Sequence, residues 1–87
     1  MRKAERKALA EIQKLVGENS VEFTEHALEE MIDEMTTVEE VRGAIEFADD
    51  CEIQPNGRWK ICCNASDLVV IVEIQDNAVI VTVFGRA

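Results

Sequence analysis

Hydrophobic residues in the first half of the chain recur every three or four positions, which is the spacing of one face of an α-helix. The first such segment covers residues 3–16 and stops at Gly17, a typical helix terminator. Its apolar positions are Ala8, Leu9, Ile12, Leu15 and Val16. We therefore predict an amphipathic helix over 3–16, followed by a short strand at residues 21–23.

Two further helices are predicted between residues 24 and 50. Thr24 is placed to cap the first, which runs to about Glu34, because a threonine hydroxyl can accept a hydrogen bond from a free amide of the first turn. Thr37 begins the second, and Glu40 follows at the spacing of a capping box. The positions expected to face the core are Ala27, Leu28, Met31, Ile32 and Met35 in the first helix, and Val38, Val41, Ile45 and Ala48 in the second.

The second half of the chain favours strands. Four β-rich segments cover residues 51–54, 58–63, 68–75 and 78–84, and turn-forming residues separate them. The order of elements predicts an α+β fold, with N-terminal helices packed on a C-terminal antiparallel sheet of about four strands. Eighty-seven residues suffice for one core, so residues 1–87 are predicted to form a single domain.

The last predicted hairpin is apolar on both faces. A turn at Asp76–Asn77 that pairs Gln75 with Ala78 would place six residues on one face: Val70, Val72, Ile74, Val79, Val81 and Val83. The opposite face would carry Val69, Ile71, Ile80 and Phe84. Helices 24–34 and 37–48 can cover one face. The other needs the helix over 3–16 or another subunit, since a bare apolar patch usually marks an interface.

Charge narrows the possible partners. The net charge is −9, and residues 18–54 carry thirteen acidic side chains against one arginine, which is −12. Residues 1–16 carry five basic and two acidic side chains, which is +3. Nucleic acids bind through lysine and arginine, so RNA is disfavoured and could be contacted only from the first helix or the last third. We expect no membrane span and no signal peptide. Three cysteines, two of them adjacent, do not form the disulfide framework of a secreted protein, so we expect a cytoplasmic protein.

Several motifs together resemble a known type of protein. "TEHALEEM", "TVEEV", "GRWKI" and "LVVIVEI…VIVTVF" follow one another as in an uncharacterised bacterial and archaeal domain family. That family is similar to the RelE-like ribonuclease toxins of toxin–antitoxin systems and is sometimes linked to the MqsR and BrnT types. The resemblance covers about residues 20–84 and leaves residues 1–17 as an added helix. It implies a RelE-like core with an RNA-facing concave side.

The resemblance also implies catalytic residues. His26 matches the family's histidine, which would act as acid or base, and Arg58 and Lys60 match the basic residues that would hold a phosphate. The chain departs from the family's pattern at Glu30 and Glu34, where arginine is usual, and it contains no tyrosine.

Each candidate residue also has a structural interpretation. His26 can be a solvated residue of the first helical turn with carboxylates nearby, and its i,i+4 pairing with Glu30 is too small a set for a metal site. Trp59 is expected in the core, which turns Arg58 and Lys60 away from the helix that carries His26. One hairpin register places Cys51 opposite Cys62.

Two functions stay open. The first is an RNA-directed RelE-like domain. The second is a non-catalytic module that acts as a homodimer, or docks an antitoxin-like partner, through the second apolar sheet face. No cofactor and no metal are expected, and a metal- or thiol-dependent regulator has little support.

Overall fold

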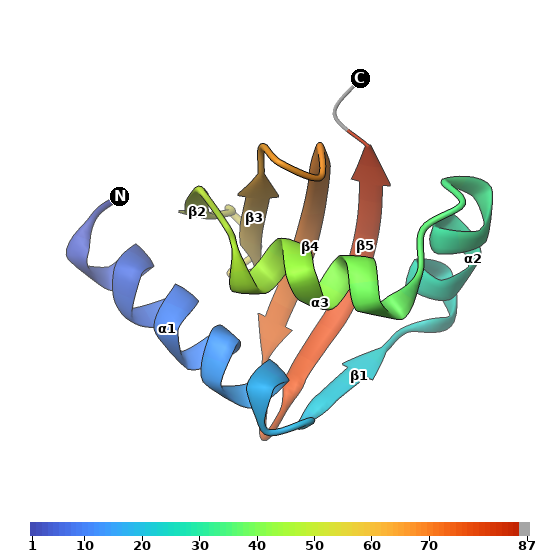
Figure 1. Cartoon of the computed structure of the whole chain (residues 1–87). Coiled ribbons are helices and arrows are strands. Elements are labelled where there is room, and N and C mark those ends of the chain that lie inside the picture. The colour runs from blue at the N-terminus through green and yellow to red at the C-terminus, as the bar shows by residue number, and fades with distance from the viewer. Residues whose placement is uncertain (86–87) are drawn as a thin grey trace.

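The computed structural model describes residues 1–85 and confirms the α+β class. Within these residues, three helices and five strands follow one another (Figure 1). They are α1 (Lys3–Gly17), β1 (Val21–Phe23), α2 (Glu25–Asp33), α3 (Val38–Glu46), β2 (Asp50–Ile53), β3 (Trp59–Cys63), β4 (Leu68–Ile74) and β5 (Ala78–Gly85).

Local sequence signals set the helix starts, as predicted. The Thr24 hydroxyl accepts a hydrogen bond from the Ala27 backbone amide at 3.0 Å. Thr37 and Glu40 form the reciprocal capping box, in which the Thr37 hydroxyl accepts from the Glu40 amide and the Glu40 carboxylate accepts from the Thr37 amide. Each pair satisfies amides that have no partner inside the helix.

The sheet has the strand order β1-β5-β4-β3-β2. Strands β2 to β5 form the predicted antiparallel meander. The short β1 lies parallel to β5, with Val21 opposite Ala78 and Phe23 opposite Ile80, which makes the sheet mixed and five-stranded rather than four-stranded. Strand β1 therefore covers only the first residues of β5.

The predicted register of the last hairpin is correct for the half near Val70 and wrong for the half near the turn. Val70 lies opposite Val83, as predicted, but Ile74 pairs with Ala78 and Val72 with Ile80. A β-bulge explains the difference, because β5 contains one extra residue between the partners of Ile71 and Val72. The bulge moves Ile80 into the core, and Val79 pairs with Glu73 on the opposite face.

All three helices pack against the same face of the sheet. The core cluster takes Leu9, Ile12 and Val16 from α1, Ala27 and Met31 from α2, Val41, Ala44 and Ile45 from α3, and inward residues of β2 to β5, among them Ile61, Val70, Val72, Ile80 and Val83. Helices α1 and α3 lie in front of the sheet and α2 lies at its β5 side (Figure 1). Helix α1 is therefore part of the core and does not cover the second face.

Helix α2 buries less than its sequence pattern predicts. Ala27 and Met31 are buried, but Leu28, Ile32 and Met35 are 43%, 76% and 90% exposed. The nine-residue helix lies beside β5 at the margin of the sheet, so only a narrow stripe of its surface reaches the core. Val38, at the start of α3, is also exposed rather than buried.

Glu5 in α1 gives the fold a defined dependence on pH. The pKa of its carboxyl lies below the ordinary value of 4.5, chiefly because the Arg2 amide donates a hydrogen bond to it at 2.7 Å; burial opposes this shift, and the Ile53 amide adds to it. A lowered folded-state pKa stabilises the fold above pH 4.5, and this stabilisation is lost as the pH falls through the lowered value.

We therefore expect Glu5→Gln to be less stable than wild type at neutral pH, with the difference shrinking below pH 4.5. Urea denaturation at neutral pH and at about pH 3.5 measures this difference. Glu11→Gln, an exposed position on the same helix, is the matched control. A gap between Glu5→Gln and wild type that stays constant with pH would contradict the assignment.

Candidate functional site

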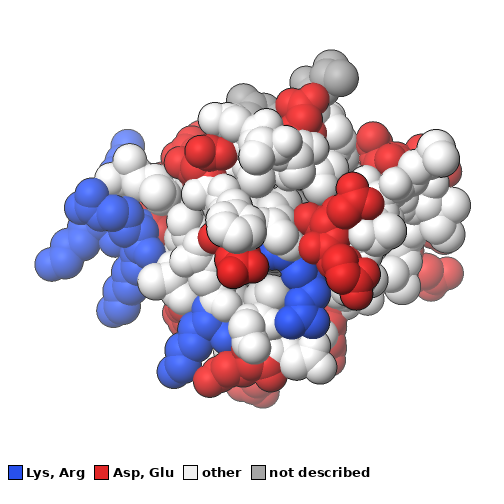
Figure 2. Space-filling model, in the orientation of Figure 1, with Lys and Arg blue, Asp and Glu red and all other residues white. Residues whose placement is uncertain are grey.

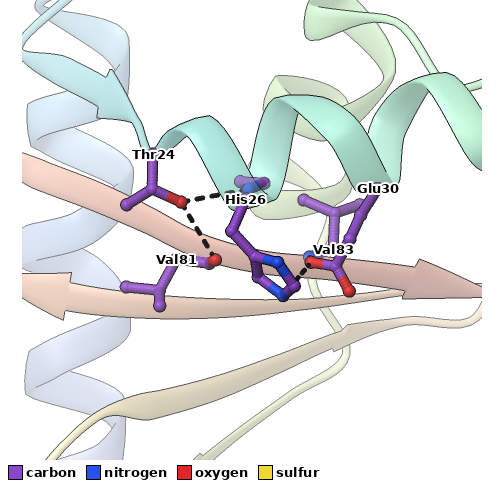
Figure 3. Close-up of polar contacts among 6 residues, drawn as sticks. Thr24, His26, Glu30, Val81 and Val83 are labelled. Carbon is purple, nitrogen blue, oxygen red and sulfur yellow. Dashed lines mark hydrogen bonds and ion pairs between the residues drawn. The ribbon is translucent and has the colours of Figure 1, made fainter.

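The histidine predicted as a catalytic group lies in the first turn of α2, next to the outer edge of β5. Its Nε2 is 3.3 Å from Oε1 of Glu30, one helical turn later (Figure 3). The imidazole is mostly exposed, and Glu30 is mostly covered. A carboxylate at this position attracts cations and repels phosphates, so the immediate surroundings of His26 do not favour an RNA backbone.

The same Glu30 carboxylate has a structural partner. Its Oε1 accepts a hydrogen bond from the Val83 backbone amide at 3.1 Å. Strand β1 ends opposite Ile80, so the later residues of β5 have no neighbouring strand on that side. Thr24 supplies the preceding contact, because its hydroxyl donates to the Val81 carbonyl oxygen at 3.1 Å (Figure 3). Two side chains thus replace backbone partners that a longer β1 would provide.

This arrangement gives Thr24 and Glu30 a definite role. A free strand edge presents unpaired amides and carbonyls to other chains and invites edge-to-edge association. Thr24 and Glu30 occupy two of these groups on β5, and His26 Nε2 lies 3.3 Å from the same Glu30 oxygen that accepts from Val83. We call Thr24, His26 and Glu30 the edge clamp of β5.

The predicted phosphate ligands lie elsewhere. Arg58 precedes β3, and its Nε is 3.5 Å from Oε1 of Glu73 on β4. Lys60 lies opposite Glu52 on β2 and Ile71 on β4, on the face turned away from the helices. Between them, Trp59 packs against the core, and the next inward residue, Ile61, is fully buried, as predicted.

The structure does not bring the three predicted catalytic residues together. Strands β4 and β5 lie between β3, which carries Lys60, and the α2 side of the sheet. Within residues 1–85, His26 has its ion pair with Glu30 and Arg58 has its ion pair with Glu73, and no contact joins the two groups. Acid–base catalysis with phosphate binding requires all of these groups around one reacting atom.

The cysteines do not form a shared site. Cys51 lies opposite Ile61, while Cys62 lies opposite Asp50, so the register that would pair Cys51 with Cys62 is not adopted. The loop closes with Ile53 opposite Trp59, which shifts the pairing by one residue. All three cysteines are free thiols, and burial raises the pKa of Cys51 to about 11, which keeps this thiol protonated at neutral pH.

No group of three or more histidine, cysteine, aspartate or glutamate side chains within residues 1–85 is placed to hold a metal ion. None of the helices there has the length and apolar character needed to cross a membrane.

The edge clamp could be predicted only in part. Thr24 carries the sequence signal of a helix cap, and that cap is present. The second bond of Thr24 and the bond from Val83 to Glu30 join positions 57 and 53 residues apart in the chain, so no local pattern announces them. The exposure of Leu28 and Ile32 on α2 could not be predicted either, because these residues have the spacing of a buried helix face.

Fold and site together define a small α+β domain with a mixed five-stranded sheet, helices on one face and a polar cluster that closes one sheet edge. Comparison of the sequence with known protein families and with curated proteins found no match, and comparison with solved structures found none either.

Proposed function

We propose that this protein is a non-catalytic interaction module that forms a homodimer through the uncovered face of its sheet. The observation that carries the proposal is the apolar character of this face, which we call the outer face. Its residues alternate with those of the core along each strand. Cys62, Val69, Ile71, Val79, Thr82 and Phe84 form the weakly polar and apolar part, and Glu52, Lys60 and Glu73 lie on the same face.

The outer face is incompletely shielded from water. Val69 and Val79 are buried by their neighbours, whereas Cys62, Ile71 and Thr82 are half-buried and Phe84 is 37% exposed. An antiparallel sheet with one free face normally alternates apolar and polar side chains, with the polar ones toward water. A free face with apolar residues on three adjacent strands is typical of an interface.

Charge also supports a second copy as the occupant of this face. The ionisable side chains around it include Lys60 opposite Glu52 and Arg58 beside Glu73, which balance in sign. The excess of negative charge resides in residues 18–54, most of which form α2, α3 and their flanks. Because the four charges around the outer face cancel, two chains of net charge −9 would repel each other less at this face than at α2 or α3. A two-fold axis would make the contact self-complementary.

The mass in solution tests this proposal. We expect wild type to sediment as a dimer of two 9.8-kDa chains at tens of micromolar protein, and Phe84→Asp to sediment as a monomer because the charge would be buried in the contact. Phe47→Asp is the matched control, since Phe47 is 69% exposed at the end of α3, on the side of the helices. A monomeric wild type, or equal masses for the two variants, would refute the proposal.

The RelE-like ribonuclease remains the alternative from the sequence motifs. This alternative predicts that wild type cleaves RNA and that His26→Ala and Arg58→Ala each abolish the cleavage. The separate ion pairs of these residues, with Glu30 and Glu73, favour the interaction module instead.

A further inference from the structure

Helix α2 carries an apolar surface that nothing in the described chain covers. Leu28 and Ile32 are four residues apart, so they lie on one side of the helix. Met35 follows the helix cap Glu34, with a positive φ of 54°, and is exposed just beyond the C-terminal end of α2. Leu28, Ile32 and Met35 are 43%, 76% and 90% exposed, and Ile32 and Met35 are the two most exposed large hydrophobic residues of the fold. We call these three residues the α2 stripe.

The α2 stripe is distinct from the outer face. Leu28 and Ile32 stand two residues before and after Glu30, which is about 160–200° around the helix at 100° per residue. Glu30 points to the edge of β5. The stripe therefore points away from that edge, and a dimer formed through the outer face would leave it accessible.

Acidic side chains border the α2 stripe. Glu25, Glu29 and Asp33 are exposed on the same helix, and Glu39 is exposed at the start of α3. The basic residue of this segment, Arg42, is engaged elsewhere, since its guanidinium donates to Asn19 Oδ1 and to the Val16 carbonyl oxygen. Figure 2 shows acidic side chains around the α2 side of the molecule, whereas lysine and arginine gather at the opposite end, over α1.

We propose that the α2 stripe binds a positively charged amphipathic helix of another protein. Leu28 and Ile32, one helical turn apart, with Met35 beyond the helix end, offer an apolar surface to the apolar side of a partner helix. The acidic border would pair with lysine and arginine beside that apolar stripe and would repel acidic competitors. Met35, an unbranched thioether, adapts its shape to the facing side chain.

Other occupants fit the observations less well. A second copy that docked α2 against α2 would place two acidic borders in contact. The basic α1 of a second copy has the right charge, but its large apolar residues Leu9, Ile12 and Val16 are buried in its own core. RNA would meet the acidic border directly. This inference goes beyond the proposed homodimer, because it uses a different surface and a different partner.

Designed peptides test the inference on the full chain. The first probe is a labelled helix of about fifteen residues with leucines at i, i+4, i+7 and i+11 and lysines elsewhere. The second has glutamate in place of every lysine, and the third has the composition of the first in a scrambled order without an apolar face. Fluorescence anisotropy reports binding. We expect wild type to bind the first probe at least about tenfold more tightly than either control, with an affinity that falls as salt rises.

Matched variants separate the apolar from the charged contribution. Ile32→Ser with Met35→Ser should weaken binding of the first probe about tenfold, because both anchors are lost. Glu29→Gln with Asp33→Asn should weaken it several-fold and flatten the salt dependence. Glu11→Gln with Glu18→Gln, two exposed acids of α1 and its cap, should leave it unchanged. These are exposed positions, where substitutions change stability by about 0.5 kcal/mol or less, and thermal melts check this.

Several results would overturn the inference. The inference fails if wild type does not bind the first probe, or if it binds the scrambled probe equally well. It also fails if the Ile32→Ser, Met35→Ser variant binds the first probe as tightly as wild type. A solution mass that drops in that variant would assign the stripe to a second copy instead. Phe84→Asp should bind the first probe as wild type does whether or not the homodimer exists, so the two proposals fail separately.

Discussion

Replacement of Ile12 by alanine should lower the free energy of unfolding by about 2–5 kcal/mol. Ile12 is fully buried on α1 and belongs to the same core cluster as Val70 and Ile80 of the sheet. The loss combines the transfer energy of the removed methyl and methylene groups with the cavity they leave. Domains of this kind are stable by about 5–15 kcal/mol, so the variant should lose a large part of its stability. Urea denaturation measures the effect.

The neighbouring residue provides the control. Glu11→Ala, exposed on the same helix, should change stability by about 0.5 kcal/mol or less. The family resemblance treats residues 1–17 as an addition to a core that begins near residue 20. If Ile12→Ala were as stable as Glu11→Ala, that view would hold and the packing of α1 described above would be wrong.

Loss of the Glu30 carboxylate should have the second-largest effect. Glu30→Ala leaves the Val83 amide without its partner at a partly buried edge, which should cost about 1–3 kcal/mol. For a domain of this size each kcal/mol corresponds to a drop in Tm of about 4–8 °C. Glu30→Gln retains a carbonyl oxygen that can accept the same bond and loses only the charge, so it should be clearly more stable than Glu30→Ala.

A third variant distinguishes the hydrogen bond from the ion pair. His26→Ala removes only the exposed partner of Glu30 and should cost about 0–1 kcal/mol. Thermal melts of the three variants at one pH should give the lowest Tm for Glu30→Ala, with Glu30→Gln and His26→Ala both melting at higher temperatures. An order in which His26→Ala is the least stable would show that the ion pair, and not the bond to Val83, holds α2 against β5.

Elements specified by local contacts could be predicted from the sequence. The caps at Thr24 and Thr37 depend on residues three positions apart, and the meander depends on turn residues between β-rich segments. These interactions form within short stretches of chain, so their residue patterns are visible in the sequence. The inward orientation of Trp59 and Ile61 followed from simple alternation along β3.

The features that could not be predicted depend on distant parts of the chain. Both faces of the last hairpin are mostly apolar, so its few polar residues, Glu73 and Thr82, do not fix the register, and the extra residue in β5 has no sequence signal. Helix α2 offers two apolar stripes, and only its position beside β5 decides that Ala27 and Met31 are buried while Ile32 is not. The partner of Glu30 lies 53 residues away. Alternation around Trp59 predicted that Arg58 and Lys60 point away from the helix that carries His26, but the ion pair of Arg58 with Glu73 was not predicted.

The parallel pairing of β1 with β5 has a consequence for how the chain folds during synthesis. Strand β1 is made first among the strands, and its neighbour in the sheet is made last. Contacts between residues so far apart in sequence close late and slow the search for the native state. Helix α1 packs mainly on β2 and α3, which emerge earlier, whereas β1 and α2 pack mainly on β5. During synthesis, β1 and α2 therefore wait for β5 before they can join the sheet.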